Sequence, residues 1–332
     1  MATHLSFFFI SFSLLIFSSL PIPTLAAKCN KDDKKVLLRI KAEFGNPYHL
    51  ASWTNNTGCC DWYDVDCDSN DRVIGLSIFQ DTAINGTIPP SIGDLPYLQN
   101  LLLHKLPQLI GGIPSTFTRL KRITMLRITW TGISGPVPDF LSEIKSLNFL
   151  DLSFNSLTGS IPASLGTLPN LNVLHLDRNR LTGTIPDSLG NLVPPASLYL
   201  SHNMLSGSIP RSLGSLQTSV LDLSRNQLVG DASFLFGAAK PTDTILISRN
   251  LLEFDLTKVA FPVNLTSLDL SHNKIYGKIP AQITALDNLQ FFNASYNSLC
   301  GEIPQGGRVQ NFDQYSFFHN KCLCGAPLEA CK

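Results

Sequence analysis

A histidine paired with a nearby carboxylate is the arrangement in this 332-residue chain that comes closest to chemistry. His175 and Asp177 are separated by one residue, which would place both side chains on the same face of a strand, where they could exchange a proton. The sequence contains no nucleophile motif, phosphate-binding loop or metal-spaced cluster to accompany them. We therefore predict no catalytic residue, no metal and no cofactor, and a protein that is not an enzyme.

Eight cysteines could also do chemistry, and they fall into two groups, one near each end of the chain. The groups are Cys29, Cys59, Cys60 and Cys67, and Cys300, Cys322, Cys324 and Cys331. An even number in an exported chain indicates disulfides, and four cysteines in a group allow three pairings that remain open here. Zinc binding is disfavoured because these spacings do not match the usual ligand spacing.

Residues 1–27 are interpreted as a secretory signal peptide, because residues 5–20 are almost all apolar or serine and Ala26 and Ala27 suit cleavage. The alternative is a membrane anchor, but Pro21 and Pro23 follow a short apolar core. No later segment approaches the roughly 18 apolar residues of a membrane span, so none is expected in the mature chain. Four N-x-S/T sequons then become candidate glycosylation sites: Asn55, Asn85, Asn264 and Asn293.

The composition favours a folded chain that does not bind nucleic acid. Hydrophobic residues make up 44% of the sequence, which is ample for a core, and charged residues make up 15%. The formal net charge is +0, whereas a nucleic-acid-binding protein would be strongly basic.

The middle of the chain repeats every 23 or 24 residues. Asparagines end a strand-like phrase such as FLDLSFN, and most are followed by L-x-G-x-I-P; they are Asn155, Asn179, Asn203, Asn226, Asn250, Asn273 and Asn297. This is the leucine-rich-repeat signature. Three looser repeats precede them, with inward pairs at Leu76/Ile78, Leu101/Leu103 and Leu126/Ile128, but without the asparagine, so their turns should be less regular.

We predict an α/β leucine-rich-repeat solenoid because a single coil cannot bury its apolar side, whereas stacked coils bury it continuously. The expected form is a curved superhelix of ten coils of about 24 residues, with a parallel β-sheet on the concave face and disulfide-bonded caps at both ends. The expected boundaries are an N-terminal cysteine-rich cap at 28–72, repeats at 73–298 and a C-terminal cysteine-rich cap at 299–332. A capping helix is expected over 31–44.

The aliphatic pair of each strand should face inward, and its neighbours and the two residues after it should face solvent. The second residue after the pair forms a column: Gln80, Lys105, Trp130, Phe154, Arg178, His202, Arg225, Arg249, His272 and Tyr296. Arginine and aromatic side chains are common hot spots of protein interfaces. We predict a protein partner on the concave face at Lys105, Arg127, Trp130, Phe154, His175, Asp177, Arg178, Tyr199, His202, Arg225, Arg249 and His272.

A plainer interpretation stands beside this prediction. The column is solvent-exposed in any such repeat, so its cations could be ordinary surface residues. The aspartates of the L-D-L phrase, Asp151, Asp222 and Asp269, could be partly structural.

Phrases in both caps and in several repeats are more specific than the repeat signature: DKKVLLRIK, CCDWYDVDCD, GDLPYL, SRNQLVGDASFLFG, HNKIYGKIP, LCGEIPQGG and HNKCLCGAPL. They resemble those of plant polygalacturonase-inhibiting proteins along the whole mature chain. The resemblance implies a right-handed solenoid with a second, shorter sheet on its flank. It also implies the disulfides Cys29–Cys59, Cys60–Cys67, Cys300–Cys322 and Cys324–Cys331.

The resemblance further implies an extracellular inhibitor, secreted to the plant cell wall or apoplast for defence. Such a protein binds pectin-degrading endopolygalacturonases of pathogens through its concave face and blocks access of the substrate. We expect a monomer, and the basic part of the column could also attract pectin, a polyanion. Two alternatives remain open: an antifreeze protein on the same coils, and a soluble receptor-like protein that binds a peptide. Members of the family are often basic, whereas this chain is neutral.

Overall fold

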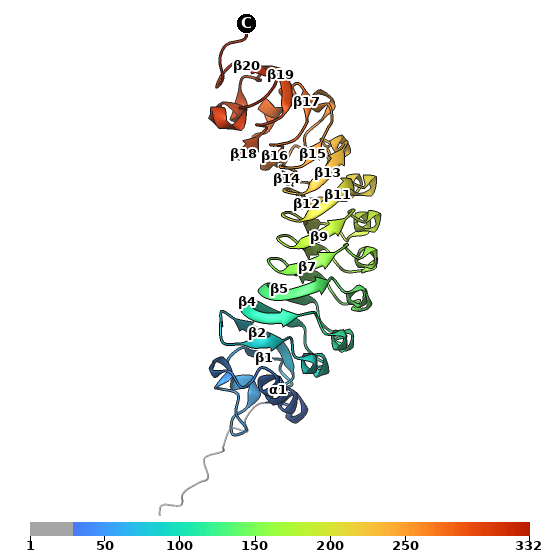
Figure 1. The fold of residues 1–332 in the computed structure, drawn as a ribbon, viewed down its shortest axis with the longest axis vertical. Coiled ribbons are helices and arrows are strands. Elements are labelled where there is room, and N and C mark those ends of the chain that lie inside the picture. The colour runs from blue at the N-terminus through green and yellow to red at the C-terminus, as the bar shows by residue number, and fades with distance from the viewer. Residues whose placement is uncertain (1–28) are drawn as a thin grey trace, which may run out of the picture.

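The computed structural model describes residues 29–332, so the predicted signal peptide lies outside the described residues. Coils stack along one long axis, from α1 (Lys31–Glu43) at the N-terminal end to β20 (Cys322–Cys324) at the C-terminal end (Figure 1). Strands from successive coils pair in parallel along the stack. The predicted leucine-rich-repeat solenoid is confirmed.

One strand from each coil forms the inner sheet. These strands are β2 (Val73–Phe79), β4 (Asn100–Gly111), β5 (Met125–Pro136), β6 (Phe149–Asp151), β8 (Val173–His175), β10 (Ala196–Tyr199), β12 (Thr218–Asp222), β14 (Thr244–Leu246), β16 (Ser267–Asp269) and β18 (Phe291–Asn293). The aliphatic pairs lie in register, so that Leu150 is opposite Leu174 and Leu174 is opposite Leu198. All three are fully buried, and the core therefore runs unbroken through the stack.

A second set of strands lies on the flank. It consists of β3 (Asn85–Thr87), β7 (Ser156–Gly159), β9 (Arg180–Gly183), β11 (Met204–Ser208), β13 (Gln227–Gly230), β15 (Leu251–Leu252), β17 (Tyr276–Gly277) and β19 (Ser298–Glu302). Several neighbours in this set pair in parallel, for example β7 with β9 and β11 with β13. The flank sheet that the resemblance implied is therefore present.

The third side of each coil is a short 3-10 helix. The ten helices of this side are η3 (Pro90–Asp94), η4 (Ser115–Arg119), η5 (Asp139–Glu143), η6 (Ala163–Thr167), η7 (Asp187–Asn191), η8 (Arg211–Gly214), η9 (Ser233–Leu235), η10 (Leu256–Lys258), η11 (Ala281–Ala285) and η12 (Gly307–Asn311). Several follow the proline of the I-P phrase, as η6 follows Pro162 and η7 follows Pro186. Proline fixes φ near the value that a helix start requires.

The repeated asparagines (the ladder asparagines) join each coil to the one before it. The Asn179 side chain accepts a hydrogen bond from the Leu157 amide at 3.0 Å and donates to the carbonyls of Leu152 at 2.9 Å and Leu176 at 3.1 Å. One buried amide group thereby satisfies three backbone groups in two coils. The later ladder asparagines make equivalent bonds: Asn203, Asn226, Asn250, Asn273, Asn297 and Asn320.

The first coils lack this asparagine, and their turns differ as predicted. Asp81, Leu106 and Thr131 occupy the ladder position there. In place of two short strands, β4 and β5 each run from the inner sheet into the flank, with a register shift between Leu106 and Ile110.

The caps close both ends of the core. The capping helix expected over 31–44 is α1. It is followed in the same cap by two short 3-10 helices, η1 (Tyr48–Leu50) and η2 (Cys59–Asp61), and by strand β1 (Val65–Cys67), which pairs antiparallel with β2. The C-terminal cap holds η13 (Gln314–Ser316) and β20. No helix within residues 29–332 combines the length and apolar character needed to cross a membrane.

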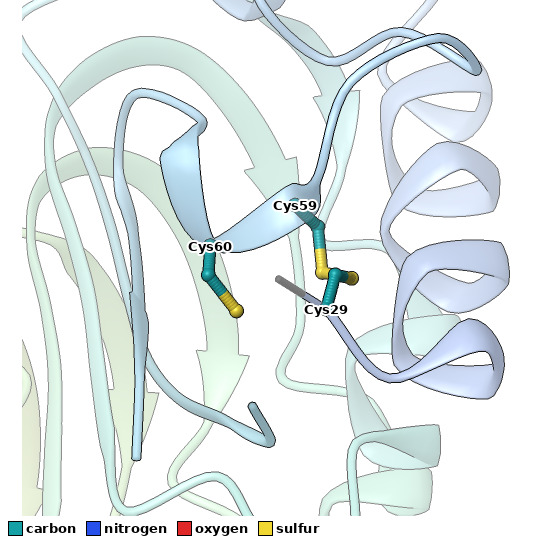
Figure 2. Close-up of side chains that lie close together, drawn as sticks. All are labelled: Cys29, Cys59 and Cys60. Carbon is teal, nitrogen blue, oxygen red and sulfur yellow. A yellow bond between two sulfur atoms is a disulfide. The ribbon is translucent and has the colours of Figure 1, made fainter. Parts of the chain in front are cut away.

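Four disulfides fasten the caps, in the pairs that the resemblance implied: Cys29–Cys59, Cys60–Cys67, Cys300–Cys322 and Cys324–Cys331. The sulfurs of Cys29, Cys59 and Cys60 lie close together (Figure 2). They belong to two neighbouring disulfides, so they are not thiolate ligands for a metal.

We expect Asn250→Ala to lower the free energy of unfolding by about 2–4 kcal/mol. Asn250 is buried and bonds the Leu228 amide and the Leu223 and Ile247 carbonyls, all of which would lose their partner. Urea unfolding followed by circular dichroism measures the effect. Gln227→Ala, at an exposed position next to the ladder, is the control and should change little. Equal effects of the two substitutions would contradict the role given to the ladder.

Candidate partner-binding face

The column that precedes the ladder position (the turn column) has one backbone conformation throughout. It comprises Gln80, Lys105, Trp130, Phe154, Arg178, His202, Arg225, Arg249, His272, Tyr296 and, in the C-terminal cap, His319, and every φ lies between 53° and 56°. This is the left-handed region, reached as the chain turns from the inner sheet toward the flank. The sequence predicted the exposure of this column but not its left-handed backbone, which periodicity does not reveal.

The stacked backbone imposes this conformation. The amide of Phe154 donates to the Asp177 carbonyl, that of Arg178 to Ser201 and that of Arg225 to Ser248, each in the next coil. A non-glycine residue pays about 1–2 kcal/mol for the left-handed region, which glycine, asparagine, aspartate and histidine tolerate best. The three histidines of the column fit that preference.

The other residues of the turn column are of types that adopt the left-handed conformation less readily. None is glycine, asparagine or aspartate, although any of these would suit the backbone better. Trp130, Phe154, Arg178, Arg225 and Arg249 instead present large or charged side chains. Backbone conformation does not explain this choice, which favours a role for the side chains themselves.

Aromatic rings stack at both ends of the column. Trp130 stacks on Phe154 with ring centroids 3.9 Å apart, and the Arg178 guanidinium lies 4.9 Å from the centre of the Phe154 ring. At the other end Tyr296 stacks between His272 and His319, at 4.1 and 4.2 Å. Because the rings support one another, these side chains are held before any partner arrives.

The middle of the column is cationic. Arg178, Arg225 and Arg249 are exposed, and within residues 29–332 no carboxylate lies within ion-pair distance of them. Burial, followed by the charges of Arg178 and Arg225, lowers the pKa of His202. The arginines therefore carry the positive charge of this stretch at neutral pH, and it is available to an acidic partner.

Small buried side chains line the inner sheet beside the column. We expected the residue directly after each aliphatic pair to face solvent, but Ser153, Ser201, Ser224, Ser248, Ser271 and Ser295 are buried. The Asp151 carboxylate accepts hydrogen bonds from the amide and hydroxyl of Ser153, and Asp222 does the same for Ser224. These aspartates are therefore structural.

One coil departs from this aspartate–serine pattern. It carries His175 where its neighbours have aspartate or tyrosine, and Asp177 where they have serine. The His175 ring nitrogen Nδ1 lies 3.7 Å from Asp177 Oδ1, and the imidazole stacks on Tyr199 at 3.9 Å. On the other side, Arg127 Nε lies 3.1 Å from Asp151 Oδ2. The structure thus brings together four of the predicted partner-binding residues: Arg127, His175, Asp177 and Tyr199.

Burial decides the charge of this cluster. It raises the pKa of Asp177 to about 7, with a further contribution from the Asp151 carboxylate, and it lowers the pKa of His175. The Asp177 carboxyl is therefore largely protonated at mildly acidic pH, and burial disfavours the charged form of the His175 imidazole. The arrangement provides a stacked, partly polar binding surface.

The predicted sequons lie on different surfaces. Asn55, Asn85 and Asn264 are exposed. Asn293 is half-buried on the inner sheet, where its side-chain oxygen accepts hydrogen bonds from the amide and hydroxyl of the buried Ser295.

Our sequence analysis missed the last member of the ladder and of the column. Asn320 makes the ladder bonds, and His319 before it has the left-handed conformation. The signal was present, because Asn320 follows Asn297 by 23 residues and the phrase HNK occurs both there and at Asn273.

The chain is similar to known proteins along almost its entire length. The leucine-rich-repeat N-terminal domain matches residues 30–68, and leucine-rich-repeat families match residues 146–168, 169–228 and 264–286. The polygalacturonase inhibitor of Pyrus communis is 58% identical, over 98% of each chain, and that of Vitis vinifera is 55% identical, over 97% of each. Among solved structures, a plant ice-binding protein is similar with a TM-score of 0.90 at 48% identity, covering 92% of this chain and 99% of that one.

We expect Asp177→Asn to stabilise the protein increasingly as pH rises from about 4 to about 7. In the folded chain the carboxyl keeps its proton up to a pKa of about 7, whereas its ordinary value is 3.8, so ionisation costs stability across that window. Above the window the gain should level off, on the order of 1–3 kcal/mol after solvent screening. Urea midpoints at several pH values measure it.

Asp187→Asn, which removes a carboxyl group from an exposed position, is the control for this prediction and should show no comparable gain. A gain for Asp177→Asn that does not vary with pH would contradict the assignment.

Proposed function

Because this chain belongs to the polygalacturonase-inhibitor family of leucine-rich-repeat proteins, we propose that it binds pectin-degrading endopolygalacturonases of pathogens and blocks access of their substrate. The binding surface is the turn column together with the adjoining inner sheet. Like the inhibitors of its family, the chain is a binding protein and not an enzyme.

The turn column is the observation that carries this proposal. Its arginines and aromatic rings stand in a backbone conformation that favours smaller residues, and they repeat at the spacing of neighbouring strands, about 4.8 Å. A ridge of regularly spaced, stacked side chains can contact a protein surface at several points with little loss of side-chain entropy. Arginine and tryptophan are the residue types that most often dominate interface energies.

Electrostatics supports the choice of partner. An enzyme that cleaves a polyanion needs a cleft that attracts anionic substrate, but its surroundings can carry acidic residues that pair with the arginines of the column. Pectin itself could compete for the same cations. Disulfides in both caps suit the oxidising environment outside the cell. We propose that the protein acts there, in the cell wall or apoplast. We further propose that it acts as a monomer.

Ice binding is a second candidate, because a plant ice-binding protein has a closely similar structure. The flank offers small exposed hydroxyl side chains on the neighbouring strands β7 and β9, at Thr158 and Thr182, and directly after these strands, at Ser160 and Thr184. This regular patch is short, and the turn column is too uneven to extend it. Ice recrystallisation assays with the purified protein test this function directly.

We expect the purified protein to inhibit at least one endopolygalacturonase in a panel of fungal and insect enzymes acting on polygalacturonic acid, with a saturable dose response. Replacing Arg178, Arg225 and Arg249 together with asparagine should weaken that inhibition at least about 30-fold, which corresponds to about 2 kcal/mol. The melting temperature should not fall, because asparagine tolerates the left-handed conformation better than arginine.

The matched control replaces Arg119, Arg180 and Arg211 with asparagine, which removes the same charge from the 3-10 and flank sides of the solenoid. This variant should inhibit nearly as well as the wild type. Failure of the folded, disulfide-bonded wild type to inhibit any enzyme would overturn the proposed function. Equal losses in the two triple variants would show that net charge matters and the turn column does not.

A further inference from the structure

An open hollow of about 450 Å³ lies at the N-terminal end of the turn column. Five residues line it: Gln80, Thr82, Lys105, Pro107 and Trp130. Three of them are successive members of the column, and the other two follow it on the turns of the first coils. We call this hollow the Trp130 pocket.

The indole of Trp130 is the main apolar wall of the pocket. The side chain is 48% exposed, although it already stacks on Phe154. Since Phe154 covers one face of the ring, the remaining surface is turned toward the coils that precede it. An exposed indole beside a hollow with a proline wall offers an apolar group a site to displace water.

Lys105 supplies the charge of the pocket. It is the single ionisable residue in the lining, and within the described chain no carboxylate lies within ion-pair distance of its ammonium group. The nearby carboxylate of Asp81 accepts hydrogen bonds from the amides of Ala83 and Ile84 and lies 3.6 Å from His49. An incoming carboxylate would therefore find a cation with no competing partner.

The walls of the pocket are held in place before binding. Gln80, Lys105 and Trp130 all have left-handed φ values between 54° and 56°, imposed by the hydrogen bonds between coils. Stacking on Phe154 further restricts the indole. Binding would therefore cost little conformational entropy, which is typical of an interface hot spot.

We propose that the Trp130 pocket receives one large apolar or aromatic side chain of the inhibited enzyme, next to an aspartate or glutamate that pairs with Lys105. The inference rests on the proposed function and adds to it the chemistry of one contact. Two observations favour this occupant: the pocket continues the cationic turn column that we assign to the partner, and its lining combines apolar surface with one unpaired cation.

The test measures inhibition constants for an enzyme that the wild type inhibits. Trp130→Ala should raise the constant at least about 30-fold. Lys105→Gln should raise it roughly fivefold at low salt and less as salt is added. Melting temperatures establish that both variants are folded.

Tyr276→Ala is the matched control. Tyr276 is 46% exposed, close to the exposed fraction of Trp130, but it lies on the flank strand β17, outside the turn column. It should raise the constant much less than Trp130→Ala. Equal effects of the two substitutions would overturn the inference. A Trp130→Ala variant that inhibits the enzyme as strongly as the wild type does would also overturn it. A wild type that inhibits no enzyme would instead overturn the proposed function, and the inference with it.

A sugar acid is the competing occupant, and tryptophan fluorescence distinguishes it. The chain has three tryptophans, of which Trp53 and Trp62 are buried, so acrylamide quenching reports mainly on Trp130. Oligogalacturonides should leave that quenching unchanged. If oligogalacturonides protect Trp130 from acrylamide quenching at concentrations at which they bind the protein, the pocket would be assigned to the polysaccharide and the inference overturned.

Discussion

The ladder asparagine is the interaction on which the rest of this solenoid depends. Each coil must turn sharply after a short strand, and the turn leaves amide and carbonyl groups inside the stack, away from water. A buried backbone group without a partner costs about 1–3 kcal/mol, and one asparagine side chain satisfies several of them in two coils at once. The first coils show what happens without it, because there β4 and β5 continue through the turn and the register shifts.

The same turn determines how the recognition surface is built. The ladder asparagine and the hydrogen bonds between coils fix the backbone of the turn. The residue that precedes the asparagine must therefore adopt a left-handed φ. Its side chain contributes almost nothing to the ladder, so its identity is free to vary. Successive coils place these side chains side by side, which is why rings and guanidinium groups that are far apart in sequence stack at 3.9 to 4.9 Å. A regular core thus produces an irregular, pre-arranged surface.

The sequence predicts the core well and the surface less well, for physical reasons. Periodicity identifies the inward pairs such as Leu174 and Leu176, because burial tolerates little variation in these positions. It does not reveal that Ser153 is buried, since that depends on where the chain leaves the strand and on the hydrogen bonds of Asp151. Nor does it reveal the Trp130 pocket, whose lining residues come from three coils and meet only when these coils stack. Asn320 was within reach of the sequence alone, because its spacing continues the ladder.

A solenoid of this kind separates stability from recognition. Its free energy comes mainly from the buried aliphatic pairs, the ladder and the disulfide-bonded caps, whereas the side chains of the turn column belong to neither the aliphatic core nor the ladder. The similarity of this chain both to polygalacturonase inhibitors and to an ice-binding protein fits that division, because the shared fold does not select a function. What distinguishes such proteins must lie in their columns of exposed side chains. In this chain those columns are cationic and aromatic rather than flat and uniform, which suits the contoured surface of another protein better than the regular surface of a crystal.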